Sequence, residues 1–206
     1  MPKAIVFDLL TALLDSWTLW TSATNDPETA LTWRKEYLRL TFSCGVYKPY
    51  SELVHASARN VGLPSSAADT LLSTWDSIRP WPETRAVLVR LKELGYRVGV
   101  VSNCSRELGH RAAGKCGVEF DAVVTAEEAG FYKPAPEAYG AVLREMGVEA
   151  EEVVFAAGSN GDVVGAGEVG MDVVWHNRIG LEGLPGRGAS IEGRELGVVL
   201  EYLGEA

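Results

Sequence analysis

The chain has 206 residues, 47% of them hydrophobic and 23% charged, which fits one domain, or one domain with an insert, around a substantial core. This composition excludes a disordered chain, and the sequence has no run of roughly 18 consecutive apolar residues, the length that a membrane helix needs. The net charge of −9, from 19 Lys and Arg and 28 Asp and Glu, would repel phosphate backbones and anionic membranes, so we expect neither nucleic acid nor a membrane as a partner.

The first predicted element is a buried strand at residues 4–8, a short run rich in Val, Ile and Phe. Residues 16–82 then show only helical periodicity, with breaks at Pro and Gly. They hold nine of the eighteen aromatic residues, which we expect to form a small core of their own and in part to line an apolar ligand pocket. We therefore predict a helical domain at 16–82, inserted after the first strand of a sheet domain made of residues 1–15 and 83–206.

Strand and helix patterns alternate through the rest of the chain. The predicted helices, which end at glycines, cover residues 82–94, 105–116 and 134–146. The predicted strands cover residues 97–102, 121–125, 152–157 and 172–176. This alternation is typical of an α/β fold with a doubly wound, Rossmann-like parallel sheet. The last predicted elements are a Gly-rich surface loop at 177–193 and a short helix that ends at about Leu203.

The cysteines and histidines do not form a motif that binds metal. Cys44, Cys104 and Cys116 lack zinc-ligand spacing, and the three histidines form no HxxxH pattern. The first residues, MPKAIVFD, lack the long apolar region and the cleavage site of a signal peptide. We therefore expect a reduced, cytoplasmic protein with no metal ion and no cofactor.

Polar residues stand at the predicted carboxyl ends of the strands, where open parallel sheets bind their ligands. Asp8 ends the first strand, Ser102 and Asn103 end the second, Lys133 lies in the loop after the third, and Asp162 follows the fourth. Each residue alone is also typical of a helix cap or a turn. Two carboxylates that share one lysine form a reasonable nucleophile site, because the cation keeps both ionised and orients the attacking oxygen.

Four motifs carry these residues in a fixed order: FDLLTALLD at 7–15, VSNCS at 101–105, YKPAPEAY at 132–139 and GSNGD at 158–162. Together they resemble the haloacid dehalogenase superfamily over nearly the whole chain, and the insert resembles the helical cap of that family. The resemblance implies that Asp8 attacks the substrate and forms a covalent aspartyl intermediate. It also implies that Ser102 and Lys133 bind substrate and nucleophile, and that Asp162 is the last acidic residue of the site.

Two departures from the phosphatases of this superfamily favour a different branch. Leu10 stands where the phosphatases carry the acid that protonates a leaving alkoxide. Gly158 stands where they carry the first acid of the motif that holds Mg²⁺, an ion that prefers octahedral oxygen ligands. A halide leaves without a proton, so a carboxylate can displace it from carbon without either acid and without a metal ion.

The sequence also resembles the L-2-haloacid dehalogenase branch in finer detail. Arg34, on the predicted insert helix with Trp33 and Tyr37, matches the arginine that meets the departing halide in that branch. Asn103 matches a second residue on the halide side, and Tyr139 matches an active-site tyrosine. The alternative for Arg34 is a solvated position on the helix surface.

The chain departs from this branch at three positions. The hydroxyl four residues after the nucleophile falls on Ala12, with Thr11 one place earlier. The Ser-Ser-Asn stretch before the last acidic residue reads Ala-Gly-Ser at 157–159, and Asn160 is the candidate substitute for its amide. The Trp that precedes the last acidic residue is Gly161. The halide pocket is therefore wider, or it is closed by one of Trp17, Trp20 and Trp33.

We predict a hydrolytic dehalogenase of a short 2-haloacid. Asp8 displaces the halide at C2, Lys133 keeps Asp8 ionised, and water activated near Asp162 hydrolyses the ester to a 2-hydroxy acid. The carboxylate of the substrate binds Ser102 and backbone N–H groups after the first strand. The expected substrate-binding residues are Leu9, Leu10, Arg34, Ser102, Asn103, Tyr139, Ser159 and Asn160.

Two alternatives stay open beside this prediction. One is a divergent phosphatase or another small-molecule hydrolase of the same superfamily, and the other is a non-catalytic binding protein that keeps the fold. The expected partner is a small 2-haloacid, and a homodimer is left open.

Overall fold

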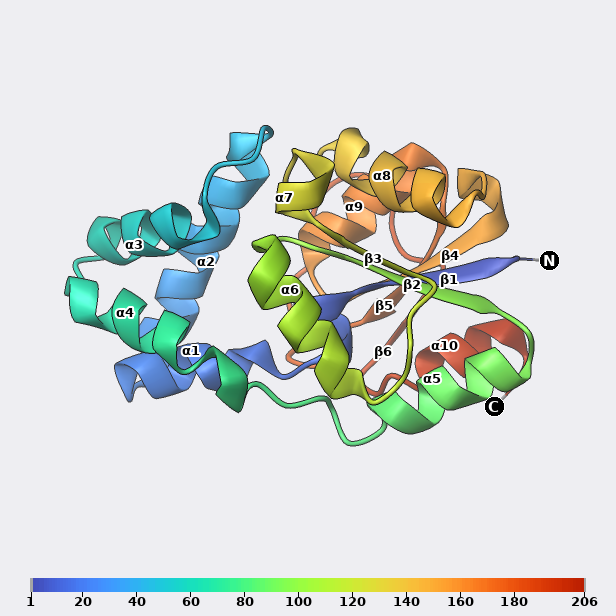
Figure 1. Cartoon of the computed structure of the whole chain (residues 1–206), viewed down its shortest axis with the longest axis horizontal. Coiled ribbons are helices and arrows are strands. Elements are labelled where there is room, and N and C mark those ends of the chain that lie inside the picture. Colours follow the sequence, from blue (N-terminus) through green and yellow to red (C-terminus); the bar gives the residue numbers. More distant parts are fainter. Residues whose placement is uncertain (1, 206) are drawn as a thin grey trace.

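A parallel sheet forms the centre of the larger domain (Figure 1). In the computed structural model, which describes residues 2–205, this sheet has six strands in the order β3-β2-β1-β4-β5-β6, and all neighbours are parallel. The strands are β1 (Ala4–Asp8), β2 (Arg97–Ser102), β3 (Ala122–Thr125), β4 (Val153–Ala157), β5 (Asp172–His176) and β6 (Ile191–Gly193). The predicted doubly wound α/β fold is confirmed.

Strand β1 occupies the position at which the order of the sheet reverses. It pairs with β2 on one side and with β4 on the other. Its side chains alternate between two buried clusters, with Val6 in one and Phe7 in the other, so both faces of the strand are covered. This explains why the run is apolar throughout. Asp8 therefore ends β1 at the switch point, where a crevice for ligands forms in such sheets.

Helices cover both faces of the sheet (Figure 1). On one face, α8 (Pro136–Met146) and α9 (Asn160–Val169) contribute Val142 and Ala166 to the cluster that holds Val6. On the other face lie α5 (Thr84–Glu93), α6 (Arg106–Ala113) and α10 (Val198–Leu203), with Leu88, Ala112 and Val199 in the cluster that holds Phe7. The short helix α7 (Ala126–Ala129) follows β3.

The helical insert lies between β1 and α5 and occupies the end of the molecule away from the N-terminus (Figure 1). Its helices are α1 (Ser16–Thr24), α2 (Pro27–Cys44), α3 (Tyr50–Asn60) and α4 (Ser65–Ser73). Asp15 and Asp26 cap α1 and α2 by accepting hydrogen bonds from the backbone N–H groups of Thr18 and Thr29, at 3.0 and 2.9 Å. The domain limits given above stay a prediction.

The insert shares its core with the sheet domain. Trp20 packs against Trp33 with ring centroids 4.6 Å apart, and both belong to the buried cluster that includes Phe7 of β1 and Leu88 of α5. The expectation of a separate small core is therefore wrong. The reason is that residues 9–14, which leave β1 toward the insert, are themselves buried and connect the two groups of side chains.

The predicted surface loop at 177–193 contains a strand that the sequence pattern did not show. Strand β6 pairs with β5, and Val174 lies opposite Ile191. Three residues in Gly-rich surroundings are too few to show an alternating pattern, so the prediction of a loop is wrong at its last three residues.

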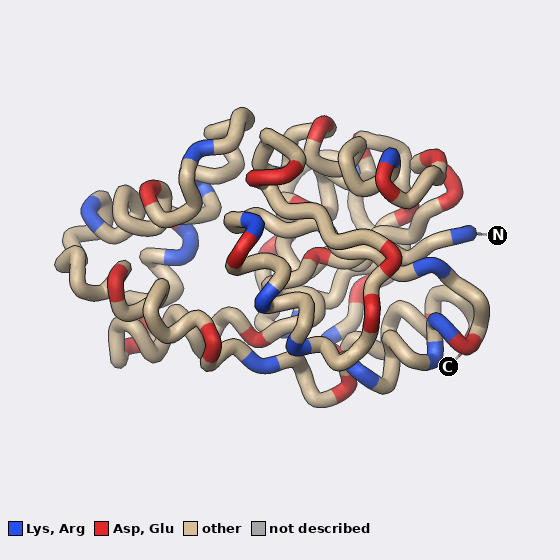
Figure 2. Tube along the Cα trace, viewed as in Figure 1, with Lys and Arg blue, Asp and Glu red and all other residues tan. Residues whose placement is uncertain are grey.

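Charged residues of both signs are spread over the helices of both domains (Figure 2). Among residues 2–205, the structure has no helix with the length and apolar character required to traverse a lipid bilayer.

Candidate active site

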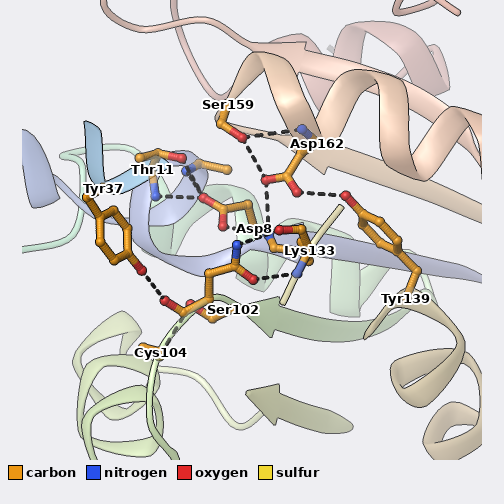
Figure 3. Close-up of polar contacts among 11 residues, drawn as sticks. Asp8, Thr11, Tyr37, Ser102, Cys104, Lys133, Tyr139, Ser159 and Asp162 are labelled. Carbon is orange, nitrogen blue, oxygen red and sulfur yellow. Dashed lines mark hydrogen bonds and ion pairs between the residues drawn. The ribbon is translucent and has the colours of Figure 1, made fainter. Parts of the chain in front are cut away.

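The nucleophile candidate Asp8 is buried, with 5% of its surface exposed, and a π-helical turn, η1 (Leu9–Leu13), directly follows it. Its Oδ2 atom accepts hydrogen bonds from the backbone N–H and the hydroxyl of Thr11, at 2.7 and 2.5 Å, and from the backbone N–H of Ala12, at 3.2 Å (Figure 3). Three donors therefore fix one oxygen of the carboxylate.

The turn also explains two departures from the family pattern. Thr11, and not residue 12, supplies the hydroxyl that holds Asp8. A Cβ atom on Gly158 would lie 2.3 Å from the Ala12 nitrogen and 2.3 Å from the Thr11 hydroxyl. Glycine at 158 is therefore required by the close approach of the turn to the end of β4, so a carboxylate cannot stand there while the turn keeps this position.

Side chains from other elements hold the carbonyl groups of the same turn. The Trp81 indole N–H donates to the carbonyl of Thr11 at 3.1 Å, and the Thr84 hydroxyl donates to the carbonyl of Leu13 at 2.7 Å. His176 Nδ1, at the end of β5, lies 2.8 Å from the carbonyl oxygen of Ala12. These three residues could not be predicted from the sequence, because nothing in their local pattern marks a contact with the turn after the first strand.

Lys133 joins the two carboxylates of the site. Its Nζ atom lies 2.8 Å from Asp8 Oδ1 and 3.0 Å from Asp162 Oδ2, and the side chain is 2% exposed (Figure 3). Burial lowers the pKa of Lys133, but Asp162 and Asp8 raise it by more, so that its pKa lies above the ordinary value and the ammonium stays charged.

The two carboxylates have opposite pKa shifts. Burial would raise the pKa of Asp8, but the Lys133 ammonium and the hydrogen bonds from Thr11 together outweigh it and hold this pKa below its ordinary value. Burial raises the pKa of Asp162, Lys133 opposes this, and the negative charge of Asp8 adds to the increase, so the pKa lies above its ordinary value. The arrangement suits an ionised nucleophile beside a group that accepts and returns a proton.

Asp162 is itself held in place by two hydroxyl groups. The Tyr139 hydroxyl donates to Asp162 Oδ1 at 2.8 Å, and the Ser159 hydroxyl donates to Oδ2 at 3.0 Å (Figure 3). Burial and the adjacent carboxylate raise the pKa of Tyr139 well above its ordinary value, so its hydroxyl remains a donor. Tyr139 is fully buried behind Asp162, whereas Ser159 lines the cavity.

Arg34 lies inside the molecule and faces the carboxylates from the insert. It is 4% exposed, so the alternative of a solvated helix position is wrong. Its guanidinium carbon lies 4.2 Å from the ring centroid of Trp17 and 5.4 Å from that of Trp20. Within residues 2–205, its Nε atom has no hydrogen-bond partner. A buried, unpaired cationic donor is costly unless an anion meets it, which favours an anion-binding role.

The remaining predicted residues lie in different places. Asn103 lines the cavity and exchanges two hydrogen bonds with the backbone of Lys133, at 2.7 and 2.9 Å. Ser102 is buried behind the cavity lining, and its hydroxyl lies 3.5 Å from the Cys104 sulfur. Leu9 is in the core, and Leu10 lines the cavity. Asn160 points to the outer surface, where its amide donates to the carbonyl of Glu182 at 3.0 Å.

A small cavity of about 30 Å³ lies between the carboxylates and the insert. Its lining from the insert consists of Trp17, Arg34, Tyr37, Leu38 and Phe42. The Tyr37 hydroxyl donates to the carbonyl of Asn103 at 2.8 Å, which ties α2 to the loop after β2. Trp17 and Phe42 line the cavity, whereas Trp20 and Trp33 belong to the core.

A family model for haloacid dehalogenase-like hydrolases matches residues 2–170. The chain belongs to the haloacid dehalogenase-like hydrolases.

Individual members of this family are similar to the chain over most of its length. Haloacetate dehalogenase H-2 of Moraxella sp. (strain B) is 26% identical over 195 residues, 87% of each chain. The crystal structure of an L-2-haloacid dehalogenase superposes with a TM-score of 0.88 at 25% identity and covers 98% of this chain and 99% of that one. A glyceraldehyde 3-phosphate phosphatase of Methanothermobacter thermautotrophicus is 37% identical over 103 residues, but these span only 48% of this chain and 46% of the phosphatase. The resemblance to the L-2-haloacid dehalogenase branch is confirmed.

The site of this haloacid dehalogenase-like hydrolase offers few side-chain ligands to a Mg²⁺ ion. Among residues 2–205, no group of three or more His, Cys, Asp or Glu side chains could hold a metal ion. The Lys133 ammonium bridges Asp8 and Asp162, and Leu10 and Gly158 offer no carboxylate. Mg²⁺ prefers octahedral oxygen ligands, and the carboxylates available here, Asp8 and Asp162, are already bound to Lys133.

Proposed function

We propose that this chain is a metal-independent hydrolytic dehalogenase that converts a short 2-haloacid to the 2-hydroxy acid. One observation carries the proposal: a buried nucleophile, held by Lys133 and by the turn after β1, faces a buried arginine whose Nε has no partner within residues 2–205. The chemistry requires a carboxylate nucleophile and an acceptor for a leaving anion, and it requires no acid at position 10. The similarity to haloacetate and L-2-haloacid dehalogenases supports the same reaction class.

In the first step, Asp8 Oδ1 attacks C2 of the acid, and the carbon–halogen bond breaks as the halide leaves with its electron pair. Oδ2 is fully occupied by three donors, whereas Oδ1 is held by Lys133 alone and is the oxygen available to carbon. The halide moves toward Arg34 and Asn103, which line the insert side and the sheet side of the cavity. Ser102 lies behind the lining and the Ser159 hydroxyl donates to Asp162, so we assign the substrate carboxylate to the backbone N–H groups after β1.

In the second step, water attacks the ester carbon of Asp8 and gives up its proton toward Asp162, whose raised pKa suits proton transfer. Negative charge develops on Oδ2, where the hydrogen bonds from Thr11 and Ala12 already point. The bond between the Asp8 carbon and Oδ1 then breaks, and the product alkoxide takes the proton from Asp162. The product carries Oδ1, and the oxygen of water remains on Asp8. The second proton of that water leaves to solvent, which restores the Asp8 carboxylate and balances the charge of the released halide.

Single-turnover reaction in heavy-oxygen water tests this mechanism. We expect halide release from 2-chloro and 2-bromo acids, and mass spectrometry of the Asp8 peptide should find the heavy oxygen there after one turnover. The Asp8→Asn variant is the control and should release no halide, because an amide is a poor nucleophile. Label found only in the hydroxy acid would contradict the covalent mechanism. Activity toward phosphate esters that chelation abolishes would favour the phosphatase alternative.

The absence of any covalent adduct and of any halide release would favour the non-catalytic alternative. The cytoplasmic location and the homodimer stay predictions, which fractionation of the native cells and sedimentation of the purified protein would test.

A further inference from the structure

An apolar groove lies directly outside the reaction cavity. The groove has a volume of about 320 Å³, against about 30 Å³ for the cavity. Trp17, Leu38 and Phe42 line both spaces, so these three side chains form the partition between them. A water-sized group needs roughly 10–15 Å³, so the space beside Asp8 is small compared with the groove.

Phe42 is the part of the partition that packs against the first turn of α9, which carries Asp162. A Cβ atom on Gly161, the residue before Asp162, would lie 2.3 Å from the tip of the Phe42 ring. The ring therefore occupies the space that a side chain at position 161 would fill. Because the ring is the far end of a side chain on α2, its removal would join the cavity to the groove without changing the backbone of α9.

The groove has the chemistry to accept an alkyl chain. Leu181 and Leu184 form its outer side, and Leu184 is 47% exposed. Lys35 lies at the groove, is exposed, and within residues 2–205 forms no ion pair, whereas Arg39 beside it is paired with Glu36. In a chain with a net charge of −9, this free ammonium attracts an anionic acid to the mouth of the groove.

We propose that Phe42, seated on Gly161, restricts the site to acids with a short chain by separating the reaction cavity from this groove. The inference rests on the proposed dehalogenase function and names the residue that sets its substrate length. When the ring is absent, the alkyl chain of a longer 2-haloacid extends through the partition into the groove, while its carboxylate and C2 stay beside Asp8.

The test compares kcat/KM for bromoacetate and 2-bromohexanoate in the wild type, Phe42→Ala and Leu40→Ala. Leu40 lies on the same helix, is also half-buried, and lines neither space, so it is the matched control. We expect Phe42→Ala to raise the ratio of hexanoate to acetate activity by about 10- to 200-fold, the range for fitting or rejecting methylene groups in an apolar pocket. Leu40→Ala should leave the ratio unchanged. An unchanged ratio in Phe42→Ala that folds normally would overturn the proposal.

A binding measurement separates this inference from the proposed function. Calorimetric titration with acetate and hexanoate, which carry no halogen, reports the length preference without any turnover. Tighter hexanoate binding by Phe42→Ala than by the wild type would support the partition, whether or not the wild type releases halide. A wild type that releases no halide would reject the proposed dehalogenase function alone. Haloacetate turnover by the wild type, with the same length preference in both proteins, would support the dehalogenase and reject the partition.

Discussion

Replacing Thr11 with valine tests how strongly the turn after β1 controls the nucleophile. Valine keeps the branched shape but removes the hydroxyl that lies 2.5 Å from Asp8 Oδ2. The backbone hydrogen bonds from residues 11 and 12 remain. Thr11→Ser is the control, because serine keeps the hydroxyl and loses only a methyl group.

The size of the effect follows from the charge on Asp8. A hydrogen bond to a charged group contributes about 1.5–3 kcal/mol, and one pH unit corresponds to about 1.4 kcal/mol, so the pKa of Asp8 should rise by about one to two pH units. The pKa of Asp8 is lower in the folded protein than its ordinary value, so the ionised Asp8 stabilises the folded state at any pH above that ordinary value. This stabilisation is lost as the pH falls through the pKa that Asp8 has in the folded protein. Thr11→Val should therefore lower the free energy of unfolding by about 1.5–3 kcal/mol at pH 7, and the difference should narrow only in strong acid.

Urea unfolding at several pH values measures this difference without relying on any activity. The acid limb of kcat/KM for a haloacid should move to higher pH in the same variant. Equal stability of Thr11→Val and the wild type at pH 7, or a Thr11→Ser variant as unstable as Thr11→Val, would show that the hydroxyl does not hold the charged carboxylate.

Three further changes probe other parts of the site. Arg34→Ala should lower kcat by about 100- to 1000-fold in a halide-release assay, because a preorganised donor to the leaving anion is lost. Arg34→Lys should recover part of the rate, and a near-normal rate in Arg34→Ala would place the halide elsewhere. Gly158→Ala should abolish turnover and lower the midpoint of thermal unfolding by about 2–10 °C, because its Cβ would press on the backbone of the turn. Unchanged turnover and midpoint would contradict the claim that position 158 must be glycine. Haloacid turnover should survive exhaustive EDTA treatment, and a loss reversed by Mg²⁺ would reject the role given to Lys133.

The sequence predicted the features that depend on local pattern and on the ends of strands. Buried parallel strands are apolar throughout, which made β1, β2, β4 and β5 visible as short Val-rich runs. Because strand ends meet at one edge of a parallel sheet, Asp8, Lys133 and Asp162 could be expected together, and they are in contact. The assignment of the residues that bind the substrate stays a prediction.

The features that the sequence did not predict depend on contacts between distant segments. The π-helical turn that brings Thr11 to Asp8 has no periodic signature in five residues. The fit of Phe42 against Gly161 joins the insert to the start of α9, and a single sequence contains no sign of such a pair. The same is true of His176 and Trp81, whose bonds to the turn exist only after the sheet and the insert have assembled.

The core that the insert shares with the sheet domain restricts how this protein could be rebuilt. Trp33 and Trp75 are buried in the same cluster as Phe7 and Leu88, so an insert taken from another relative would meet a sheet face shaped for different side chains. Recombination at the two connections would therefore require compensating changes in β1 and α5. For the same reason, we expect both domains to melt in a single cooperative transition, and specificity to be altered more readily by substitutions along α2 than by exchange of whole segments.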